Sequence, residues 1–286
     1  MSGQILYGKE IAAGIKQEVK QYLTRFDQKH INVKLVAVQV GENSSSQVYL
    51  NSQKKSCQAM GITHEIQNLP ATISESDLIR FIEQLNKDNS ITGIILQLPL
   101  PTGMDVRKIQ SKIAPEKDVE GVNPVNLGWI LYGRPLLAPC TALAVKELID
   151  STGVDLYGKE VVMVGHSDIV GKPVALLLVD KFATVSICHI GTSDRGMLDH
   201  HVKEAEILIV AVGKAGLIKG EWIREGAIVI DVGINAVGDK IVGDVEFETA
   251  KERAGWITPV PGGVGPVTTA MLLKNTVTAA RLIFGC

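Results

Sequence analysis

The sequence predicts an α/β protein of two domains, the second built around a doubly wound, mostly parallel sheet. Short apolar runs rich in β-branched residues alternate along the chain with segments of helical character. Residues 160–178 show this unit most clearly, because an apolar strand at 161–164 leads through Gly165 into a run of helix-forming residues. With 286 residues, the chain is long enough to form two domains.

The first half of the chain is predicted to form a helix, followed by alternating strands and helices. Ile11, Ile15 and Val19 recur at helical spacing, and serines that can cap a helix follow the first strand. Prolines end the third strand, and the segment PEKDVEGVNPVN reads as irregular. We expect helices at 9–26, 47–60, 74–86 and 108–113, and strands at 33–40, 62–69 and 93–98.

The second half repeats the alternation after a helix expected at 141–151. We expect strands at 161–164, 184–189, 207–212 and 227–232, with helices at 174–178 and 197–204. The glycine- and proline-rich segment PVPGGVGP follows, and residues 267–284 form a closing helix. Placing the boundary near Pro139 gives one domain of residues 1–139 plus 267–286 and another of residues 140–266.

Composition argues against several classes of partner. Lys and Arg number 29 against 31 Asp and Glu, so no net field attracts nucleic acid or an anionic membrane. The N-terminal residues lack a signal-peptide pattern and no apolar run is long enough to span a bilayer, so we expect a cytoplasmic protein. Four widely spaced cysteines and six histidines form no metal-binding pattern, and no metal is predicted.

The turn after residue 164 is a candidate phosphate-binding site. A tight turn between a strand and a helix directs backbone N–H groups and the positive end of the helix dipole toward one point, which suits a pyrophosphate. Its spacing, G-x-S-x-x-x-G over residues 165–171, differs from the common G-x-G-x-x-G. Dinucleotide binding and an ordinary turn therefore both remain open from this motif alone.

Eight motifs together resemble one family over nearly the whole chain. In order, they are SSSQVYLNSQKKS, GIILQLPLP, PEKDVEGVNP, PCTA, VVMVGHSDIVGKP, AVGKAG, GAIVIDVGIN and TPVPGGVGP. They resemble the bifunctional methylenetetrahydrofolate dehydrogenase/methenyltetrahydrofolate cyclohydrolase (FolD) family. This resemblance implies a catalytic domain of two chain segments, a Rossmann-like NAD(P)-binding domain, a folate cleft between them and a homodimer.

The resemblance also implies roles for individual residues. Tyr49 would stack on the folate, Gln97 would hydrogen-bond the ligand and the family's catalytic lysine, and Glu120 would bind the pterin. The implied catalytic residues are Tyr49, Gln53, Gln97 and Glu120; those implied to bind folate are Tyr49, Gln97, Leu98, Pro99, Glu120, Pro261, Gly262 and Gly263. Implied contacts to the nucleotide are Gly165, His166, Ser167, Ile169, Val170, Gly171, Ile190, Val212, Gly213 and Ile234.

Two positions depart from the family pattern. The family carries a lysine four residues after the tyrosine, and Gln53 stands there in this chain. Lys54 is adjacent, but one residue turns a helix by about 100 degrees, away from the face of Tyr49. At Glu120 the family has an aspartate, and glutamate keeps the charge on a side chain that is one methylene longer.

We therefore expect hydride transfer from methylenetetrahydrofolate to a nicotinamide cofactor, with cyclohydrolase activity weak or lost. Hydride transfer requires mainly alignment of two bound molecules, whereas hydrolysis requires a group that titrates, and Gln53 does not titrate. NADP is the expected cofactor, with NAD as the alternative. The competing interpretations are a fully bifunctional enzyme, a catalytically impaired folate- or nucleotide-binding protein, and a dehydrogenase acting on hydroxy acids.

Overall fold

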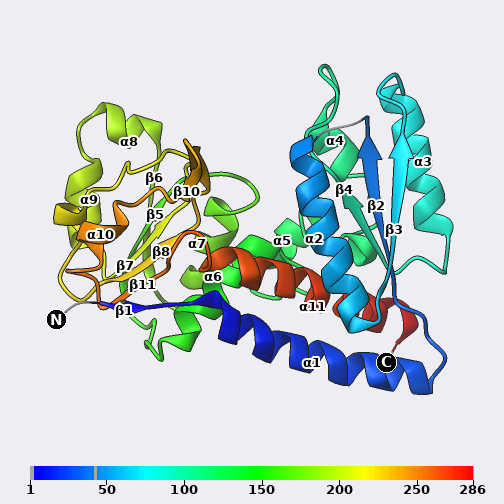
Figure 1. The fold of residues 1–286 in the computed structure, drawn as a ribbon, viewed down its shortest axis with the longest axis horizontal. Helices are drawn as coiled ribbons and strands as arrows, with labels where there is room; N and C mark the ends of the chain where they lie inside the picture. Colours follow the sequence, from blue (N-terminus) through cyan, green and yellow to red (C-terminus); the bar gives the residue numbers. More distant parts are fainter. Residues whose placement is uncertain (1–2, 42–43, 286) are drawn as a thin grey trace. The chain divides into compact units, whose positions relative to one another are not determined.

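The computed structural model describes the backbone of residues 3–41 and 44–285, and the side chains of residues 3–41 and 50–285. It confirms the α/β class, because parallel sheets are joined by helices (Figure 1). The chain divides into two compact units. One comprises Met1–Ala13 and Thr141–Met271, and the other comprises Gly14–Cys140 and Leu272–Cys286.

The unit that contains residues 14–140 is built on a three-stranded parallel sheet. Its strand order is β3-β2-β4, and β2 pairs with both neighbours. The last six residues of β2 are buried, and all of them except Gln39 are apolar, as expected for the central strand of a parallel sheet. The elements are α1 (Gly8–Gln28, shared with the other unit), β2 (Lys34–Val40), α2 (Ser44–Met60), β3 (Thr63–Leu69), α3 (Glu75–Lys87), β4 (Gly93–Leu96), α4 (Val106–Gln110), a 3-10 turn at Pro115–Lys117, and α5 (Pro124–Leu131).

Alternation of side chains along β2 gives this sheet two different faces. Val36, Val38 and Val40 pack with buried residues of α3 and α4, which cover one face. Leu35, Ala37 and Gln39 point to the opposite face because successive strand side chains alternate. Helix α3 begins after Ser74, whose hydroxyl accepts a hydrogen bond from the Asp77 N–H and so caps the helix.

The other unit contains a six-stranded sheet in the order β1-β11-β8-β7-β5-β6, with every neighbouring pair parallel. This is the predicted doubly wound sheet, extended by two short strands at one edge. Its elements are β1 (Gln4–Ile5), α6 (Cys140–Ser151), β5 (Glu160–Val164), α7 (Gly171–Val179), β6 (Thr184–Cys188), α8 (Ile190–Asp194), α9 (Leu198–Glu204), β7 (Ile207–Val210), a 3-10 turn at Gly220–Trp222, β8 (Ile228–Asp231), α10 (Phe247–Ala250) and β11 (Trp256–Ile257).

Several elements differ from the sequence predictions. Strands β1 and β11 have two residues each, too few to show a periodicity, and β9 (Asn235–Val237) and β10 (Lys240–Val242) form a short antiparallel hairpin. The prediction of irregular backbone is wrong from Pro124 onward, where α5 begins. Asn123 caps this helix by accepting from the Val125 N–H, and Pro124 occupies its first turn.

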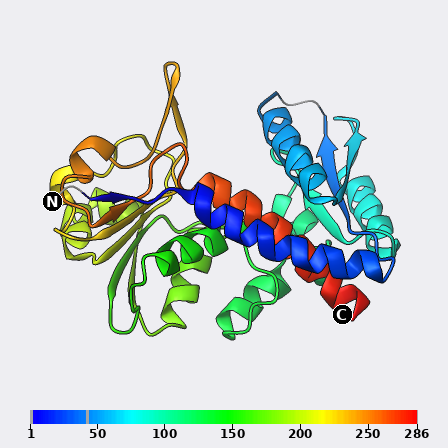
Figure 2. The ribbon, with the colours of Figure 1, turned by 60° about the horizontal axis from the view of Figure 1, so that its bottom comes forward.

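The closing helix α11 (Val264–Phe284) confirms the expectation of a long C-terminal helix. In the unit that contains residues 14–140, its C-terminal part lies beside α1 (Figure 2). Lys274 pairs with Glu18 at 3.1 Å, and the Arg281 guanidinium lies 4.9 Å from the centre of the Tyr22 ring. Within the described part of the chain, no helix has the length and apolar character needed to cross a membrane.

Candidate functional site

The turn after β5 brings three segments of backbone into close contact. Gly165 has φ of 122°, and a Cβ built on it would lie 2.4 Å from the Ala211 carbonyl oxygen. A Cβ at Gly171, the first residue of α7, would lie 2.2 Å from the Gly165 carbonyl oxygen. Only glycine fits either position, so the sequence sets the shape of this turn. This close packing of strand, turn and helix suits a pyrophosphate-binding turn.

Within this turn, Ser167 has a local role. Its hydroxyl accepts hydrogen bonds from the N–H groups of Val170 and Gly171, at 3.2 and 3.4 Å, and so holds the backbone that leads into α7. The exposed side chains of His166, Ser167 and Ile169 leave the turn accessible to a ligand. These bonds are those of an ordinary turn, and the contact of Ser167 with a nucleotide stays a prediction.

The remaining nucleotide candidates follow the carboxyl ends of neighbouring strands. Ile190 begins α8 after β6, Val212 and Gly213 follow β7, and Ile234 follows β8. Because these strands are parallel to β5, all the candidates lie at the same edge of the sheet as Gly165. Ile234 is 70% exposed and Ile190 is 72% exposed, which is unusual for isoleucine and suits contact with a ligand.

In the unit that contains residues 14–140, two predicted site residues are in direct contact. Gln53 of α2 is 2% exposed and Gln97, directly after β4, is 6% exposed. The Gln97 Nε2 donates a hydrogen bond of 3.2 Å to the Gln53 Oε1. The Gln53 Nε2 is buried without a hydrogen-bond partner among the described residues, so this amide has N–H groups left to donate. Leu98 and Pro99, which follow Gln97, are exposed.

Gln53 and its neighbour Lys54 lie on different sides of α2. Leu50, Gln53 and Cys57 are buried at helical spacing, whereas Lys54 is exposed. This agrees with the predicted turn of about 100 degrees between residues 53 and 54. Tyr49 lies in the same helix, but its side chain is outside the described residues.

Glu120 lies in the loop before α5, close to a buried aspartate. A parallel bridge between Ile94 and Asp118 places this loop beside β4. Burial, reinforced by the negative charge of Asp118, raises the pKa of Glu120 to about 8. The carboxylate expected to hold the pterin therefore carries a proton near neutral pH unless ligand N–H groups favour its ionised form.

Asp118 itself has a structural role. Its side chain is fully buried and accepts hydrogen bonds from the Asn123 N–H at 2.7 Å and the Asn126 Nδ2 at 2.9 Å. The neighbouring Lys117 is also buried, and its Nζ donates to the Asn86 and Asp88 carbonyl oxygens at the end of α3. Both residues therefore hold the loop that carries Glu120.

The predicted folate loop follows β11. Gly262 has φ of 110°, and its carbonyl oxygen accepts a hydrogen bond from the Gly8 N–H at 2.9 Å. A Cβ at Gly263 would lie 2.6 Å from the Thr258 Cβ, so the loop folds tightly on the end of its own strand. Pro261 is exposed. The backbone is thus fixed while the outer side of the loop is open to a ligand.

Sequence reasoning missed Gln39 as a candidate. This residue of β2 is 3% exposed, and its Oε1 has no hydrogen-bond partner among the described residues. It lies on the β2 face opposite Val38 and Val40. A polar residue within an otherwise apolar strand, in VKLVAVQV, was the available signal.

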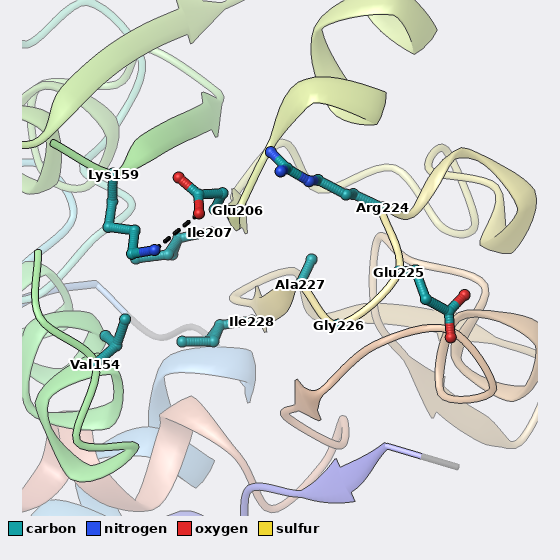
Figure 3. A pocket seen from close by; sticks show the side chains of 9 residues that line it. All are labelled: Val154, Lys159, Glu206, Ile207, Arg224, Glu225, Gly226, Ala227 and Ile228. Carbon is teal, nitrogen blue, oxygen red and sulfur yellow. Dashed lines mark hydrogen bonds and ion pairs between the residues drawn. The ribbon is translucent and has the colours of Figure 1, made fainter. Parts of the chain in front are cut away.

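A pocket at the opposite edge of the six-stranded sheet is a competing location (Figure 3). It measures about 190 Å³ and lies at the amino ends of β5, β7 and β8. Three of its charged side chains are engaged, because Lys159 pairs with Glu206 at 2.8 Å and Arg224 donates to the Glu204 carbonyl oxygen. The carboxyl edge, with its glycine turn, fits a nucleotide better.

The part of the chain whose side chains are described contains no group of three or more His, Cys, Asp or Glu residues arranged to hold a metal ion. Cys57, Cys140 and Cys188 are buried and form no disulfide.

Comparison with protein families gives two matches that together span most of the chain. Residues 6–120 match the catalytic domain of tetrahydrofolate dehydrogenase/cyclohydrolase. Residues 139–284 match the NAD(P)-binding domain of the same enzyme family.

Individual relatives agree with these matches over their full lengths. The chain is 52% identical over 282 residues to the bifunctional protein FolD of Moorella thermoacetica, covering 98% of this chain and 100% of that protein. The crystal structure of a bifunctional FolD from Campylobacter jejuni superposes with a TM-score of 0.94 at 42% identity, covering 98% and 99% of the two chains. A Trypanosoma brucei FolD, complexed with NADP and an inhibitor, gives a TM-score of 0.94 at 38% identity, with 100% of both chains covered.

Proposed function

Because the chain belongs to the tetrahydrofolate dehydrogenase/cyclohydrolase (FolD) family, we propose that it is an NAD(P)-dependent methylenetetrahydrofolate dehydrogenase whose cyclohydrolase activity is weak or lost. Both domain types of the family are present. NADP is the proposed cofactor, supported by the relative that binds NADP and is aligned over the whole chain.

The dehydrogenase half of the proposal rests on alignment. A nicotinamide cofactor supplies the hydride acceptor, and the protein holds the two reactants at the distance and orientation that hydride transfer requires. The glycine turn at Gly165 and Gly171 fits the pyrophosphate, while Val212, Gly213 and Ile234 are available at the adjoining strand ends. None of these contacts requires a side chain that gains or loses a proton.

The proposed loss of cyclohydrolase activity rests on one observation, the buried Gln53–Gln97 pair. Hydrolysis of the methenyl group requires activation of water and movement of protons by a positioned group that titrates. Gln53 occupies the position where the family resemblance places a lysine, and a carboxamide does not titrate. Its unpartnered Nε2 can donate a hydrogen bond to a ligand but cannot accept a proton. Lys54 is exposed on another side of α2.

A fully bifunctional enzyme is the second candidate, and Glu120 is the observation in its favour. The raised pKa of about 8 means that this carboxyl group gains and loses a proton near neutral pH. A group that titrates near the working pH is suited to general acid–base catalysis. Glu120 would then replace the missing lysine as the proton-transfer group.

One assay separates these candidates. Purified protein is supplied with methylenetetrahydrofolate and either NADP or NAD, and formation and decay of the methenyl product are followed separately. The proposal predicts hydride transfer with accumulation of methenyltetrahydrofolate. Decay as fast as formation, after subtraction of the uncatalysed rate, supports the bifunctional enzyme. Binding of both ligands without hydride transfer supports an impaired binding protein.

The homodimer, the cytoplasmic location and the division into residues 1–139 plus 267–286 and residues 140–266 stay predictions. The homodimer is proposed from family membership. Light scattering of the purified chain measures its mass in solution, and a monomer mass would contradict the proposal.

A further inference from the structure

Two buried aspartates lie at the carboxyl edge of the six-stranded sheet, beside the predicted nucleotide contacts. Asp231 is the last residue of β8 and is 4% exposed. Asp244 follows the β9–β10 hairpin and is fully buried. Neither residue was a sequence candidate for the site. Burying a carboxylate costs free energy unless hydrogen bonds compensate, so their partners indicate what they do.

Asp244 binds the turn that follows β7. Its Oδ2 accepts hydrogen bonds from the N–H groups of Val212 at 2.7 Å and Gly213 at 3.0 Å. Its Oδ1 accepts from the Lys214 N–H at 2.7 Å and from the Asn235 Nδ2 at 2.9 Å. A single carboxylate therefore fixes three consecutive backbone amides and is close to its full capacity as an acceptor.

Asp231 in turn holds the segment that carries Asp244. Its Oδ1 accepts from the N–H groups of Gly233 and Asp244, both at 3.0 Å, and its Oδ2 accepts from the Val245 N–H at 2.9 Å. Its own backbone N–H donates to the Thr258 Oγ1 at 2.8 Å. Asp231 thus connects the turn after β8 with the loop of Asp244 and with the residue that follows β11.

Two glycines leave the space that the two aspartate side chains occupy. Gly233 lies two residues after Asp231, and a Cβ on it would lie 2.1 Å from the Asp244 carboxyl carbon. Gly243 directly precedes Asp244, and a Cβ on it would lie 1.9 Å from the Asp231 Oδ2. Each glycine therefore provides space for the other segment's carboxylate. Any larger residue at either position would displace an aspartate.

We propose that Asp244 is a positioning residue for the nicotinamide nucleotide. It holds Val212 and Gly213 directly, and through Asn235 it holds the segment that presents Ile234. The inference rests on the proposed function, which takes these three residues as cofactor contacts. Seven N–H donors compensate the two carboxylates, and a buried, rigid backbone at this point keeps the exposed contact residues in one conformation.

Burial and the nearby charge of Asp244 raise the pKa of Asp231 to about 6, against the opposing effect of its N–H donors. Two like charges are therefore kept together at an electrostatic cost. Such a cost is characteristic of functional sites, which supports a role beyond packing.

The test is Asp244→Asn in the full-length chain. Asparagine has one acceptor oxygen and a donor NH₂ group, so at least one N–H of the turn loses its acceptor. We expect the KM for the nucleotide to rise about tenfold or more, since each lost charge-assisted hydrogen bond accounts for roughly that factor. The KM for methylenetetrahydrofolate should change by less than about twofold. Glu246→Gln, which neutralises a partly exposed acid two residues away, is the matched control and should change neither constant.

A milder variant and a second measurement cover the case in which Asp244→Asn does not fold. Asn235→Ala removes one donor to Asp244 and should raise the nucleotide KM in the same direction by a smaller factor. Amide hydrogen exchange at residues 212–214 should also become faster in both variants.

An unchanged nucleotide KM in a folded Asp244→Asn protein would overturn the inference. So would an equal rise in the KM values of both substrates, because that indicates a general structural defect. If the wild-type protein binds no nicotinamide nucleotide, the proposed function itself fails. Accelerated exchange at residues 212–214 would then still show that Asp244 holds the turn, which distinguishes the two failures.

Discussion

Replacing Gln53 with lysine should increase the rate of methenyltetrahydrofolate hydrolysis by about 100-fold or more. A positioned proton-transfer group typically contributes roughly 100- to 10,000-fold to a rate, and the low end applies because Glu120 can alter the position of the substrate. Hydride transfer should change far less, since it depends on alignment of the two bound molecules. The variant therefore tests the missing lysine separately from the rest of the site.

The structure indicates how a lysine would behave at this position. Gln53 is 2% exposed, so an amine in its place would lose contact with water, which lowers its pKa toward neutrality. The Gln97 carboxamide, now 3.2 Å from Gln53, can turn its oxygen toward the amine and accept a hydrogen bond. Loss of the amide pair and burial of an amine should cost about 1–3 kcal/mol of stability, which a melting curve measures.

The assay supplies methenyltetrahydrofolate directly and records its decay above the uncatalysed rate. Gln53→Met is the matched control, because methionine has a similar length and cannot titrate, and it should leave hydrolysis at the wild-type level. Lys54→Ala tests the neighbouring lysine and should also have no effect. A folded Gln53→Lys protein that transfers hydride but gains no hydrolysis would refute the reasoning. Wild-type hydrolysis as fast as hydride transfer, lost in Lys54→Ala, would assign the proton transfer to Lys54.

Three further predictions concern the ligands and pH. Tyr49→Ala should raise the folate KM about fivefold or more and leave the nucleotide KM unchanged, because stacking accounts for roughly 1 kcal/mol; an unchanged folate KM would place the pterin elsewhere. Catalytic efficiency should favour NADP, as family membership implies, because residues 188–193 after the second strand of this domain include no acid to hold the ribose hydroxyls of NAD; a preference for NAD of about tenfold would contradict this. Glu120, with its pKa raised to about 8, holds a proton in the folded state that the unfolded chain releases above about pH 4.5. The free energy of unfolding should therefore fall as pH rises from about 4.5 to about 8, and it should fall less steeply in Glu120→Gln. Unfolding is measured at a series of pH values across this range. An equal dependence of the unfolding free energy on pH in the two proteins would refute the assignment.

Much of the fold was predictable because its signals are local. Apolar runs of strand length and the spacing of Ile11, Ile15 and Val19 specify their elements within a few neighbouring residues. Strands β1 and β11 were not predictable, because two-residue strands exist only through pairing with partners far away in the sequence. The start of α5 did have a local signal, Asn123 followed by Pro124, which the surrounding glycines and prolines obscured.

The candidate site divides in the same way. Gly165 and Gly171 could be predicted from their spacing after an apolar strand, and the orientations of Gln53 and Lys54 follow from helical geometry. The Asp231–Asp244 arrangement could not be predicted, because its meaning depends on backbone amides up to 32 residues away in the sequence. An aspartate beside a glycine is also common in ordinary turns. Only the folded structure shows that these carboxylates are buried and accept hydrogen bonds from seven N–H groups.

The distribution of buried charge supports the separation of the two activities. Beside the predicted nucleotide contacts, the protein keeps two buried carboxylates and compensates them with seven N–H donors. At the position of the family lysine it has a neutral carboxamide, hydrogen-bonded to Gln97, in a place where a buried amine would require its own compensation. Gln53 removes that desolvation cost and the titrating group together. In the proposed function, alignment for hydride transfer depends on the compensated carboxylates and the fixed backbone and survives this change, whereas proton transfer does not. For this reason, accumulation of the methenyl product is the outcome that the proposed function requires.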